Sequence, residues 1–362
     1  MEDLTLKQYL EDGIRHLSQD IIKATVKNPQ TSLAMARFAK GRRAAEARRE
    51  AYQIQGTHVP PFLIASITSR CNLHCKGCYA RAEGACVDGS EEQGMDAPLW
   101  NRIFEEARDL GCSFILLAGG EPFLRPDVLE AAATHPEILF PIFTNGTLLT
   151  DKALDFLKKH RNLIPILSVE GDATLTDTRR GAGMYQRLMN SMTTLHQQGL
   201  LYGTSVTVTR ENQAVVTSRD FLDTLTERGC RVVFFVEYVP ICKGTGGLAP
   251  TPADRTRLMA ALHGLRDHYD DCIFIAFPGD EARSGGCLAA GRGFFHINPK
   301  GDAEPCPFSP YSDTNLRQAS LLEALHSKLF TQLQSQGTLT QDHDGGCVLF
   351  AEENQVKALL EA

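Results

Sequence analysis

Short apolar runs alternate with amphipathic stretches from residue 62 to residue 239 of the chain. A near-continuous apolar run is typical of a strand that is buried on both faces, and such strands alternate with helices in parallel sheets built of βα units. Six units fall short of the eight that close a barrel, so the pattern predicts an α/β fold with a partial (β/α)6 TIM-like barrel. The predicted strands are residues 62–68, 113–119, 138–144, 163–169, 202–208 and 232–239, and the predicted helices include residues 98–110, 126–135, 151–160, 183–198 and 218–228.

Residues 1–58 contain no strand-like run, and we predict a helical extension in front of the barrel. Its first segment has apolar residues at helical spacing from Leu6 to Ile22. Its second segment carries a basic cluster with two open interpretations: a solvated helix face on which basic residues alternate with Glu46 and Glu50, or a surface for lipid or phosphate. The cluster comprises Arg37, Lys40, Arg42, Arg43, Arg48 and Arg49.

The alternation stops beyond residue 270, which indicates a small appended module. Residues 294–308 predict a hairpin that turns at residues 299–302, and residues 319–334 predict a helix. The predicted domains are therefore an N-terminal helical extension (1–58), the barrel (59–275) and a C-terminal hairpin-plus-helix module (276–362).

The bulk composition limits the class of protein. Of the 362 residues, 43% are hydrophobic and 22% are charged, as is usual for a soluble globular protein. The formal net charge of -7 argues against general nucleic-acid binding. No run of 18 apolar residues predicts a membrane span, and the acidic, amphipathic N-terminus does not resemble a secretory signal, so we expect a cytoplasmic protein.

Eleven cysteines in a reducing compartment favour metal binding or catalysis over disulfides. Three of them, Cys71, Cys75 and Cys78, fall in one loop directly after the first predicted strand. A structural zinc site needs four protein ligands, and no His or Cys follows Cys78 at zinc-finger spacing. Three closely spaced thiolates can instead hold three corners of a [4Fe–4S] cluster and leave one iron free to bind a ligand.

The other unusual loops also follow predicted strands. The segment "GGEPFLRPD" follows the second strand, "EGDATLTDTRRG" follows the fourth, and "PICKGTGG" follows the sixth. In parallel α/β folds the active site lies at the C-terminal ends of the strands. We therefore expect these loops to meet the three-cysteine loop on one face of the barrel.

The spacing C-x3-C-x2-C, followed by the aromatic Tyr79, resembles the radical S-adenosylmethionine (radical SAM) superfamily. The resemblance covers about residues 60–350, and it implies an oxygen-sensitive enzyme. In that family SAM binds the open iron of the [4Fe–4S] cluster. An electron from the cluster cleaves SAM to methionine and a 5′-deoxyadenosyl radical, which abstracts a substrate hydrogen. The resemblance also implies a reductant such as flavodoxin or ferredoxin.

The loop after the second strand resembles a SAM-binding motif of that family. Gly119, Gly120, Glu121 and Pro122 match the segment that holds the SAM amino group. Glycine lets the backbone approach a ligand closely, and a carboxylate suits an ammonium group. The alternative is a plain glycine-rich turn. Asn145 after the third strand is similarly placed, and an Asn-Gly turn is its alternative.

The loops after the fourth and fifth strands resemble further SAM-binding segments. Ser168 matches a serine that contacts the SAM ribose, and Glu170 stands where relatives often carry Asp. Arg180, directly before Gly181, matches an arginine that meets the SAM carboxylate, a pairing that suits a guanidinium group. Thr207 matches a polar strand end near SAM.

A second set of three cysteines, Cys287, Cys306 and Cys347, lies in the C-terminal module. The spacing C-x13-G-x4-C, with the hairpin and helix that follow, resembles the opening of SPASM or twitch modules, which hold auxiliary iron–sulfur clusters. The cysteine-rich run that holds a second cluster in fuller SPASM members is absent from this sequence, so the resemblance implies at most one auxiliary [4Fe–4S] cluster. Its fourth ligand stays open among Cys242, Cys272, a non-cysteine side chain, water and the substrate.

The remaining cysteines have different expected roles. Cys242 follows the sixth strand at the active end, and three roles are open: a hydrogen-atom donor, which makes it the candidate catalytic residue, an auxiliary ligand, or a buried thiol. Cys112 and Cys230 lie between a helix end and a strand start, and Cys272 begins an apolar run. We expect these three to be buried structural thiols. Cys86 stays without an assigned role.

Three functions are compatible with the sequence. The resemblance to SPASM-type enzymes suggests a maturase that modifies a peptide or protein, although residues 1–58 contain no strands of a peptide-recognition domain. Radical modification of a small-molecule cofactor precursor or a lipid is the alternative. A non-catalytic electron-transfer protein is the third, and it predicts four cysteines on the main cluster and requires neither the GGEP motif nor the Arg180 segment.

Overall fold

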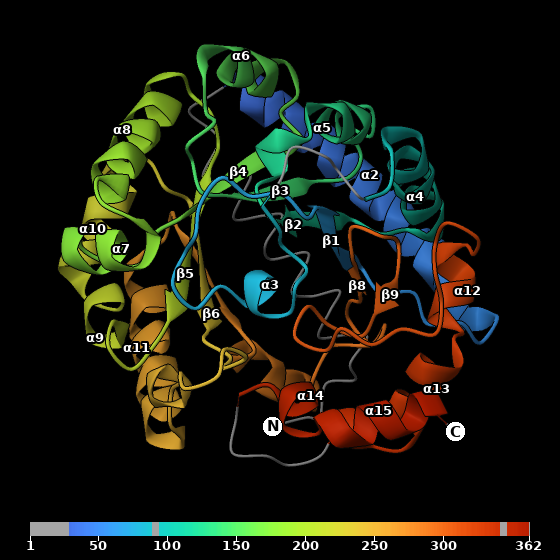
Figure 1. The fold of residues 1–362 in the computed structure, drawn as a ribbon. Helices are drawn as coiled ribbons and strands as arrows, with labels where there is room; N and C mark the ends of the chain where they lie inside the picture. Colours follow the sequence, from blue (N-terminus) through green and yellow to red (C-terminus); the bar gives the residue numbers. More distant parts are fainter. Residues whose placement is uncertain (1–28, 89–93, 341–345, 362) are drawn as a thin grey trace.

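The structure is a computed structural model that describes residues 29–88, 94–340 and 346–361. In these residues a single open sheet of nine strands has the order β7-β6-β5-β4-β3-β2-β1-β8-β9 (Figure 1). The strands are β1 (Phe62–Thr68), β2 (Phe114–Gly119), β3 (Phe140–Thr144), β4 (Leu163–Ser168), β5 (Gly203–Val208), β6 (Val232–Glu237), β7 (Ile273–Phe277), β8 (His296–Ile297) and β9 (Ala303–Glu304).

Helices surround the curved sheet on its outer side, as Figure 1 shows. None of the described helices is both long enough and apolar enough to cross a membrane. The α-helices are α2 (Pro29–Ile54), α3 (Tyr79–Ala82), α4 (Ala97–Leu110), α5 (Pro126–Ala133), α6 (Asp151–Lys159), α7 (Ala173–Arg180), α8 (Met184–Gln197), α9 (Gln213–Val216), α10 (Arg219–Glu227), α11 (Pro252–His268), α12 (Leu321–Leu325), α13 (Lys328–Ser335), α14 (Val348–Ala351) and α15 (Glu353–Glu361). The 3-10 turns are η1 (Pro122–Leu124), η2 (Gly246–Leu248), η3 (Gly279–Ser284) and η4 (Thr338–Thr340).

The predicted partial α/β barrel is confirmed, with one more parallel strand than the pattern indicated. β1 to β7 are joined by parallel pairing throughout, and β7 pairs with β6 from Val232↔Ile273 to Val236↔Phe277. The β7 run has only five residues and follows the long helix α11, so it could not be distinguished from a loop by periodicity. The boundary predicted between residues 275 and 276 falls inside this strand.

Local sequence signals explain how the helices begin and end. In α4, the carboxylate of Asp96 accepts a hydrogen bond from the backbone N–H of Leu99 at 3.0 Å and caps the N-terminus. The helix ends at Gly111, whose φ of 100° is left-handed. Between these caps Trp100 and Phe104 are fully buried against the sheet side of the helix. The predicted range of 98–110 is therefore confirmed to within one residue.

The long helix α2 packs across the N-terminal end of the barrel and runs behind the sheet in Figure 1. Its Met35 and Phe38 are fully buried among residues at the start of the strands, including Phe114 and Ile164. The Phe38 and Phe114 rings meet edge to face with their centroids 5.3 Å apart. The part of the extension that the structure describes therefore covers one end of the barrel.

The basic cluster on α2 does not act as one surface. Arg49 is buried and donates hydrogen bonds to the Gly111 carbonyl and to the Ser113 hydroxyl, the latter at 3.2 Å. Arg48 donates to the Arg108 carbonyl at 3.1 Å, so both side chains stabilise the C-terminus of α4. Most of the other basic residues are exposed. The apolar segment predicted between Leu6 and Ile22 lies outside the described residues.

The C-terminal module is attached to the barrel through β8, which pairs in parallel with β1. β8 and β9 form the predicted hairpin, with the register His296↔Glu304. The helix predicted at residues 319–334 is instead two helices, α12 and α13, because the chain bends after Leu325. The hydroxyl of Ser327 accepts a hydrogen bond from the Phe330 N–H at 3.2 Å and starts the second helix.

Candidate active site

A cavity of about 940 Å³ lies inside the barrel. Its lining includes Phe62 and Phe114 at the N-terminal ends of the strands, and loop residues at their C-terminal ends. All eleven cysteines are described, and the three that line this cavity are Cys71, Cys75 and Cys78. The loops expected to share one face therefore do so, and the three-cysteine loop faces the interior of the barrel.

The three-cysteine loop is held in place by backbone hydrogen bonds. The Lys76 N–H donates to the Arg179 carbonyl at 2.8 Å, which ties the loop to the end of α7. The Arg81 guanidinium donates two hydrogen bonds to the Leu73 carbonyl, at 2.9 and 3.2 Å. Cys78, the third cysteine of the loop, is the N-cap residue of α3, so the start of this helix fixes its position. A loop anchored at these points can present its thiols in a fixed arrangement.

The surroundings of the thiols favour the charged form at one position and oppose it at another. The Cys86 thiol hydrogen-bonds to Cys71 and lowers the pKa of that thiol to about 6. Burial raises the pKa of Cys75, and the Arg180 guanidinium lies 3.8 Å from the Cys75 sulfur and opposes that rise. The thiolate is the form that binds metal, so one thiol is already prepared for ligation.

The donor set fits an iron–sulfur cluster better than a single ion. Thiolates are the usual ligands of iron–sulfur clusters, and a cubane takes each of them on a different iron, so the sulfurs need not meet at one point. Among the described residues, no three His, Cys, Asp or Glu side chains are grouped as ligands of one metal ion. Cys71, Cys75 and Cys78 would hold the cluster, and the cavity they face has room for a further ligand.

The GGEP turn brings the end of β2 against the start of the three-cysteine loop. Gly119 has a φ of 113°, and a Cβ there would lie 2.4 Å from the Thr68 carbonyl oxygen. A Cβ on Gly120 would lie 1.9 Å from the Arg70 carbonyl oxygen. Both glycines line the cavity, so this close approach of two backbones forms part of its wall. Only glycine fits at these positions.

Glu121 is fully buried beneath this turn, next to Pro122 at the start of η1. Its carboxylate accepts hydrogen bonds from the Asn145 N–H at 2.7 Å, the Thr144 hydroxyl at 2.8 Å and the Phe123 N–H at 3.1 Å. Burial nevertheless raises the pKa of Glu121 to about 7. The carboxylate therefore joins the loops after β2 and β3.

Asn145 has the turn role that the sequence offered as one of two alternatives, and its contact with SAM stays a prediction. Its side-chain oxygen accepts a hydrogen bond from the Thr147 N–H at 2.9 Å, which is the geometry of an Asx turn. Its amide nitrogen donates to the side chain of Asn72 in the three-cysteine loop at 2.8 Å. Asn145 also lines the cavity. It is at once a turn residue and a contact of that loop.

Glu170 is the centre of a charged network beside Cys75. The carboxylate is 1% exposed and lies 2.5 Å from the Arg180 guanidinium and 3.3 Å from that of Arg179. It also accepts the Thr207 N–H at 3.1 Å. One carboxylate faces two guanidinium groups, so the network carries a net positive charge where both arginines line the cavity. An anionic group of a ligand would be bound there favourably.

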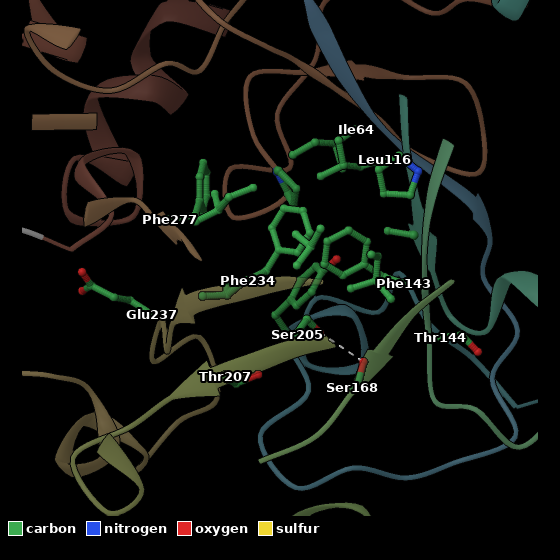
Figure 2. Close-up of a pocket in the computed structure, with 18 of the residues that line it drawn as sticks. Ile64, Leu116, Phe143, Thr144, Ser168, Ser205, Thr207, Phe234, Glu237 and Phe277 are labelled. Carbon is green, nitrogen blue, oxygen red and sulfur yellow. Dashed lines mark hydrogen bonds between the residues drawn. The ribbon is translucent and has the colours of Figure 1, made fainter. Parts of the chain in front are cut away.

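A band of small polar residues separates this charged end from the rest of the cavity. Ser168 and Ser205 face each other with their hydroxyl oxygens 3.3 Å apart, and Figure 2 shows this pair close to Thr207. Thr207 also accepts a hydrogen bond from Arg179 at 3.4 Å. Ser168, Ser205 and Thr207 all line the cavity. Their hydroxyls are suited to hydrogen bonding with a sugar or a similar polar group.

Beyond the serine pair the cavity wall is apolar. Figure 2 shows Ile64, Leu116, Phe143 and Phe234 pointing into a common space, with Phe277 beside them. The Phe143 and Phe234 rings are in edge-to-face contact, with centroids 5.2 Å apart. The wall beyond the serine pair is thus mainly aliphatic and aromatic, whereas Arg179 and Arg180 line the part beside the three-cysteine loop.

The second cysteine set is also brought together. The Cys306 and Cys347 thiols hydrogen-bond to each other, and Cys287 lies close enough to both to raise the pKa of Cys306 further. Cys287 and Cys306 are buried, whereas Cys347 is half-buried at the N-cap of α14. These three residues form a thiol cluster that is separate from the loop of Cys71, as expected from the spacing.

Aromatic residues connect the two cysteine sets. Tyr79, which follows Cys78 directly, contacts Phe308, which lies two positions after Cys306. The ring centroids are 5.2 Å apart, in an edge-to-face arrangement, and both residues line the cavity. The C-terminal module therefore forms one wall of the same chamber.

The structure places the other cysteines at both ends of the barrel. The Cys242 sulfur is 3.9 Å from the Cys78 carbonyl oxygen, and its side chain is half-buried beside the three-cysteine loop. Its catalytic role stays a prediction. Cys112, Cys230 and Cys272 are buried near the starts of their strands, and the Cys230 and Cys272 thiols hydrogen-bond to each other.

The sequence did not reveal a buried polar network in the hairpin. His296 accepts or donates at both ring nitrogens, 2.8 Å from the Ser66 hydroxyl and 2.6 Å from the Glu304 carboxylate. All three residues are buried and none of them lines the cavity, so the network joins β8 and β9 to β1. The available signal was that residues 296 and 304 lie on opposite sides of the predicted turn, three positions before it and two after it.

A further missed residue is Glu281, in the turn η3 after β7. It is buried, it lines the cavity, and its carboxylate accepts a hydrogen bond from the Cys287 thiol. Its position depends on β7, which the apolar pattern did not predict, so no local signal in the sequence pointed to it.

Comparison with known proteins agrees with this geometry. The family model described as the radical SAM superfamily matches residues 65–235, from within β1 to within β6. The AdoMet-dependent heme synthase of Methanosarcina barkeri is 26% identical over 294 residues, which cover 74% of this chain and 82% of that protein. The mycofactocin maturase MftC of Mycobacterium tuberculosis is 28% identical over 273 residues, which cover 70% of this chain and 66% of that protein.

Solved structures with the same fold include Streptococcus suis SuiB bound to S-adenosylmethionine. The TM-score is 0.65 at 19% identity, and the alignment covers 80% of this chain and 73% of that one. The family implies SAM and a [4Fe–4S] cluster as cofactors, and three cavity-facing cysteines of matching spacing lie in the matched region. Residues 65–235 therefore form a radical SAM domain, and the chain is similar to enzymes of the radical SAM superfamily.

Proposed function

We propose that the protein binds a [4Fe–4S] cluster through Cys71, Cys75 and Cys78, cleaves SAM reductively at that cluster, and abstracts a hydrogen atom from a substrate held in the barrel. The observation that carries the proposal is that these three of the eleven cysteines line the cavity. When bound, the cluster supplies the electron that cleaves SAM, and SAM supplies the 5′-deoxyadenosyl group that takes the hydrogen.

Within this proposal the protein's own residues position SAM. Arg180 is fixed beside Cys75 by its ion pair with Glu170, and the neighbouring Arg179 leaves positive charge for the SAM carboxylate. The backbone at Gly119 and Gly120 is open to the cavity and suits the SAM ammonium group. The hydroxyls of Ser168, Ser205 and Thr207 are the donors and acceptors proposed for the ribose.

We propose that the substrate is a small molecule with a large apolar surface. The cavity volume of about 940 Å³ is at the upper end of the range for small-molecule sites, so it can hold SAM and a second molecule. The part beyond the serine pair is lined by side chains such as Leu116, Phe143 and Phe234, which favour an apolar ligand. Several similar proteins are named for heme synthesis, and one is named Fe-coproporphyrin III synthase.

A peptide substrate is the second candidate, because MftC and SuiB are both similar to this chain. MftC is named as a maturase, and one SuiB structure contains the precursor peptide SuiA. In residues 29–61 the structure describes one helix in front of β1, and that helix covers the end of the barrel. We favour the small molecule because the wall beyond the serine pair is apolar and includes Leu116, Phe143 and Phe234.

We also propose one auxiliary [4Fe–4S] cluster on Cys287, Cys306 and Cys347. The support is that these thiols lie together at the wall of the chamber, with Cys306 and Cys347 in hydrogen-bonding contact. An auxiliary cluster there would be separated from the first by the Tyr79 and Phe308 rings. Its expected role is to anchor the substrate or to accept an electron from the substrate radical.

The first experiment tests SAM cleavage. Purified protein is reconstituted anaerobically with iron and sulfide, reduced with dithionite and given SAM, and 5′-deoxyadenosine is measured by chromatography. We expect formation in the wild type and none above background in Cys71→Ala, Cys75→Ala or Cys78→Ala. Cys112→Ala, at the other end of the barrel, is the control that should keep activity. The proposal is wrong if the wild type holds iron but forms no 5′-deoxyadenosine.

The second experiment separates the two substrate classes. Binding of Fe-coproporphyrin III, whose macrocycle has a large apolar surface, is measured by absorption titration in the wild type and in Phe234→Asp. A buried, unpaired carboxylate should weaken binding at least about tenfold. The control is Ile54→Asp, because Ile54 is 79% exposed. Absence of porphyrin binding, with binding of a fluorescent precursor peptide instead, would support the peptide alternative.

A further inference from the structure

The turn after β9 places a serine hydroxyl opposite the second cysteine of the C-terminal module. Cys306 and Ser309 form an antiparallel bridge on either side of a two-residue turn, Pro307 and Phe308. The Ser309 N–H donates to the Cys306 carbonyl at 2.9 Å and closes the turn. Residues directly opposite each other in such a pair carry their side chains on the same face, with Cβ atoms about 5 Å apart. The Ser309 hydroxyl is therefore near the Cys306 thiol.

The hydroxyl of Ser309 is a buried polar group without a partner in the described part of the chain. The residue is 1% exposed, and its Oγ forms no hydrogen bond with any other described residue. An unsatisfied hydroxyl in the interior costs free energy, so nearly all buried polar groups in proteins have a partner. The hydroxyl of Ser312, three residues later, follows this rule and donates to the Thr314 carbonyl at 2.8 Å. Ser309 therefore indicates a partner outside the described residues.

The orientation of the turn shows on which side this partner lies. Pro307 and Phe308, at the tip of the turn, line the cavity, whereas Cys306 and Ser309, at its base, do not. The Ser309 hydroxyl therefore does not border the space proposed for SAM and the substrate. The group that it faces is in the interior of the module, on the side of the Cys306 thiol.

An iron–sulfur cluster on the C-terminal cysteines fits this hydroxyl. The Ala290 N–H donates to the Pro305 carbonyl at 3.0 Å, which holds the chain after Cys287 against the residue before Cys306. A cluster on these cysteines carries sulfide and thiolate sulfurs, and both kinds accept hydrogen bonds. A serine hydroxyl can donate such a bond and keep its proton bound, whereas it would have to lose the proton to become an iron ligand.

We infer that the Ser309 hydroxyl donates a hydrogen bond to a sulfur of the auxiliary cluster on Cys287, Cys306 and Cys347 and raises the reduction potential of that cluster. The inference rests on the proposed auxiliary cluster. Reduction adds one negative charge to the cluster, and a hydrogen bond to a more negative acceptor is stronger, so the donor stabilises the reduced form more than the oxidised form. A raised potential makes the cluster a better electron acceptor, which favours the electron-accepting role over the anchoring role.

The test uses a full-length background in which Cys71, Cys75 and Cys78 are all replaced by Ala, so that the electron paramagnetic resonance (EPR) signal comes from the auxiliary cluster. After anaerobic reconstitution, EPR-monitored redox titration gives the midpoint potential of this parent, of Ser309→Ala and of Ser309→Thr. We expect about four irons per chain in all three proteins. At a fixed potential, the ratio of reduced to oxidised cluster should fall about fivefold in Ser309→Ala, which corresponds to a midpoint about 40 mV more negative. Ser309→Thr keeps the hydroxyl and should stay close to the parent.

The matched control is Ser312→Ala in the same module, because the Ser312 hydroxyl already has a carbonyl acceptor. It should leave the midpoint potential unchanged. A second measurement is electron–nuclear double resonance of the reduced cluster in H2O and D2O, in which the parent should show an exchangeable proton coupling that Ser309→Ala lacks.

Three results would overturn the inference. The first is a Ser309→Ala protein with about four irons and the potential of the parent, and the second is a Ser309→Thr protein as negative in potential as Ser309→Ala. The third is a Ser309→Ala protein with only about three irons, because the hydroxyl would then be an iron ligand. A parent without iron overturns the auxiliary cluster and this inference with it, whereas SAM cleavage by the wild type is judged separately.

Discussion

The sharpest consequence of the site geometry concerns Gly120, where the end of β2 meets the three-cysteine loop. A Cβ at this position would lie 1.9 Å from the Arg70 carbonyl oxygen and 3.0 Å from the Cys71 backbone nitrogen. The same Arg70 carbonyl accepts the Glu121 N–H at 2.8 Å. In Gly120→Ala the two backbones must therefore separate, and the first cysteine must move with the loop.

The size of the effect follows from the overlap. Ordinary contact begins at 3.4 Å, so the loop or the turn must shift by about 1.5 Å. Overpacking of this kind costs about 1–3 kcal/mol, and loss of the Glu121 hydrogen bond adds about 1 kcal/mol. A displacement of about 1 Å in a catalytic constellation lowers the rate about 100-fold. We therefore expect 5′-deoxyadenosine formation in Gly120→Ala to fall by about that factor.

The assay is anaerobic 5′-deoxyadenosine formation per reconstituted cluster, with circular dichroism to verify folding. The matched control is Gly264→Ala in α11, where a Cβ meets no atom within 4 Å. That substitution should leave SAM cleavage unchanged and stabilise the helix by about 0.5–1 kcal/mol. Activity of a folded Gly120→Ala protein within about twofold of the wild type would refute the reasoning.

Three further predictions concern stability. Glu170→Ala leaves two largely buried guanidinium groups without their carboxylate partner, which should lower the free energy of unfolding by about 3–5 kcal/mol in urea titrations; an unchanged midpoint would mean that the ion pairs are not formed. Phe38→Ala removes a ring that packs on Phe114, and it should lower the free energy of unfolding by about 3–5 kcal/mol in the same assay. A decrease below about 0.5 kcal/mol, as is usual for a surface substitution, would show that α2 does not cover the barrel. Thr251 holds the pKa of Asp254 at about 2 by hydrogen bonding, so this carboxylate stabilises the protein above about pH 4 and the contribution is lost as the pH falls towards 2. The thermal midpoint of Asp254→Asn should accordingly depend less steeply on pH in this range, and equal slopes would contradict the assignment.

The parts of the fold predicted correctly from the sequence are those set by local signals. Strand β1 and helix α4 follow from a continuous apolar run and from a capped amphipathic pattern, and neither depends on distant residues. The three-cysteine loop was also predicted from a local signal, because the spacing of three cysteines on one loop is visible in the sequence. The shared cavity of Cys71, Gly120 and Arg180 followed from the rule that parallel strands carry their sites at one end.

The parts that were missed depend on contacts between distant segments. β7 is short, and it is recognised as a strand only by its pairing with β6. Glu281 follows β7 directly, so its position could not be predicted without that strand. The burial of Phe38 requires the open end of the barrel to be present. Arg180 was expected to meet SAM, and its pairing with Glu170 depends on the path of α7, which spacing alone does not describe.

The most direct test of the central claim is the EPR spectrum of the reduced first cluster with and without SAM. The measurement uses a protein in which Cys287, Cys306 and Cys347 are replaced by Ala, so that the signal comes from the cluster on Cys71, Cys75 and Cys78. We predict that SAM changes the spectrum, because we propose that its amino and carboxylate groups bind an iron that no cysteine holds. An identical spectrum at saturating SAM, in protein with about four irons per chain, would contradict the claim that this cluster has an open corner for SAM.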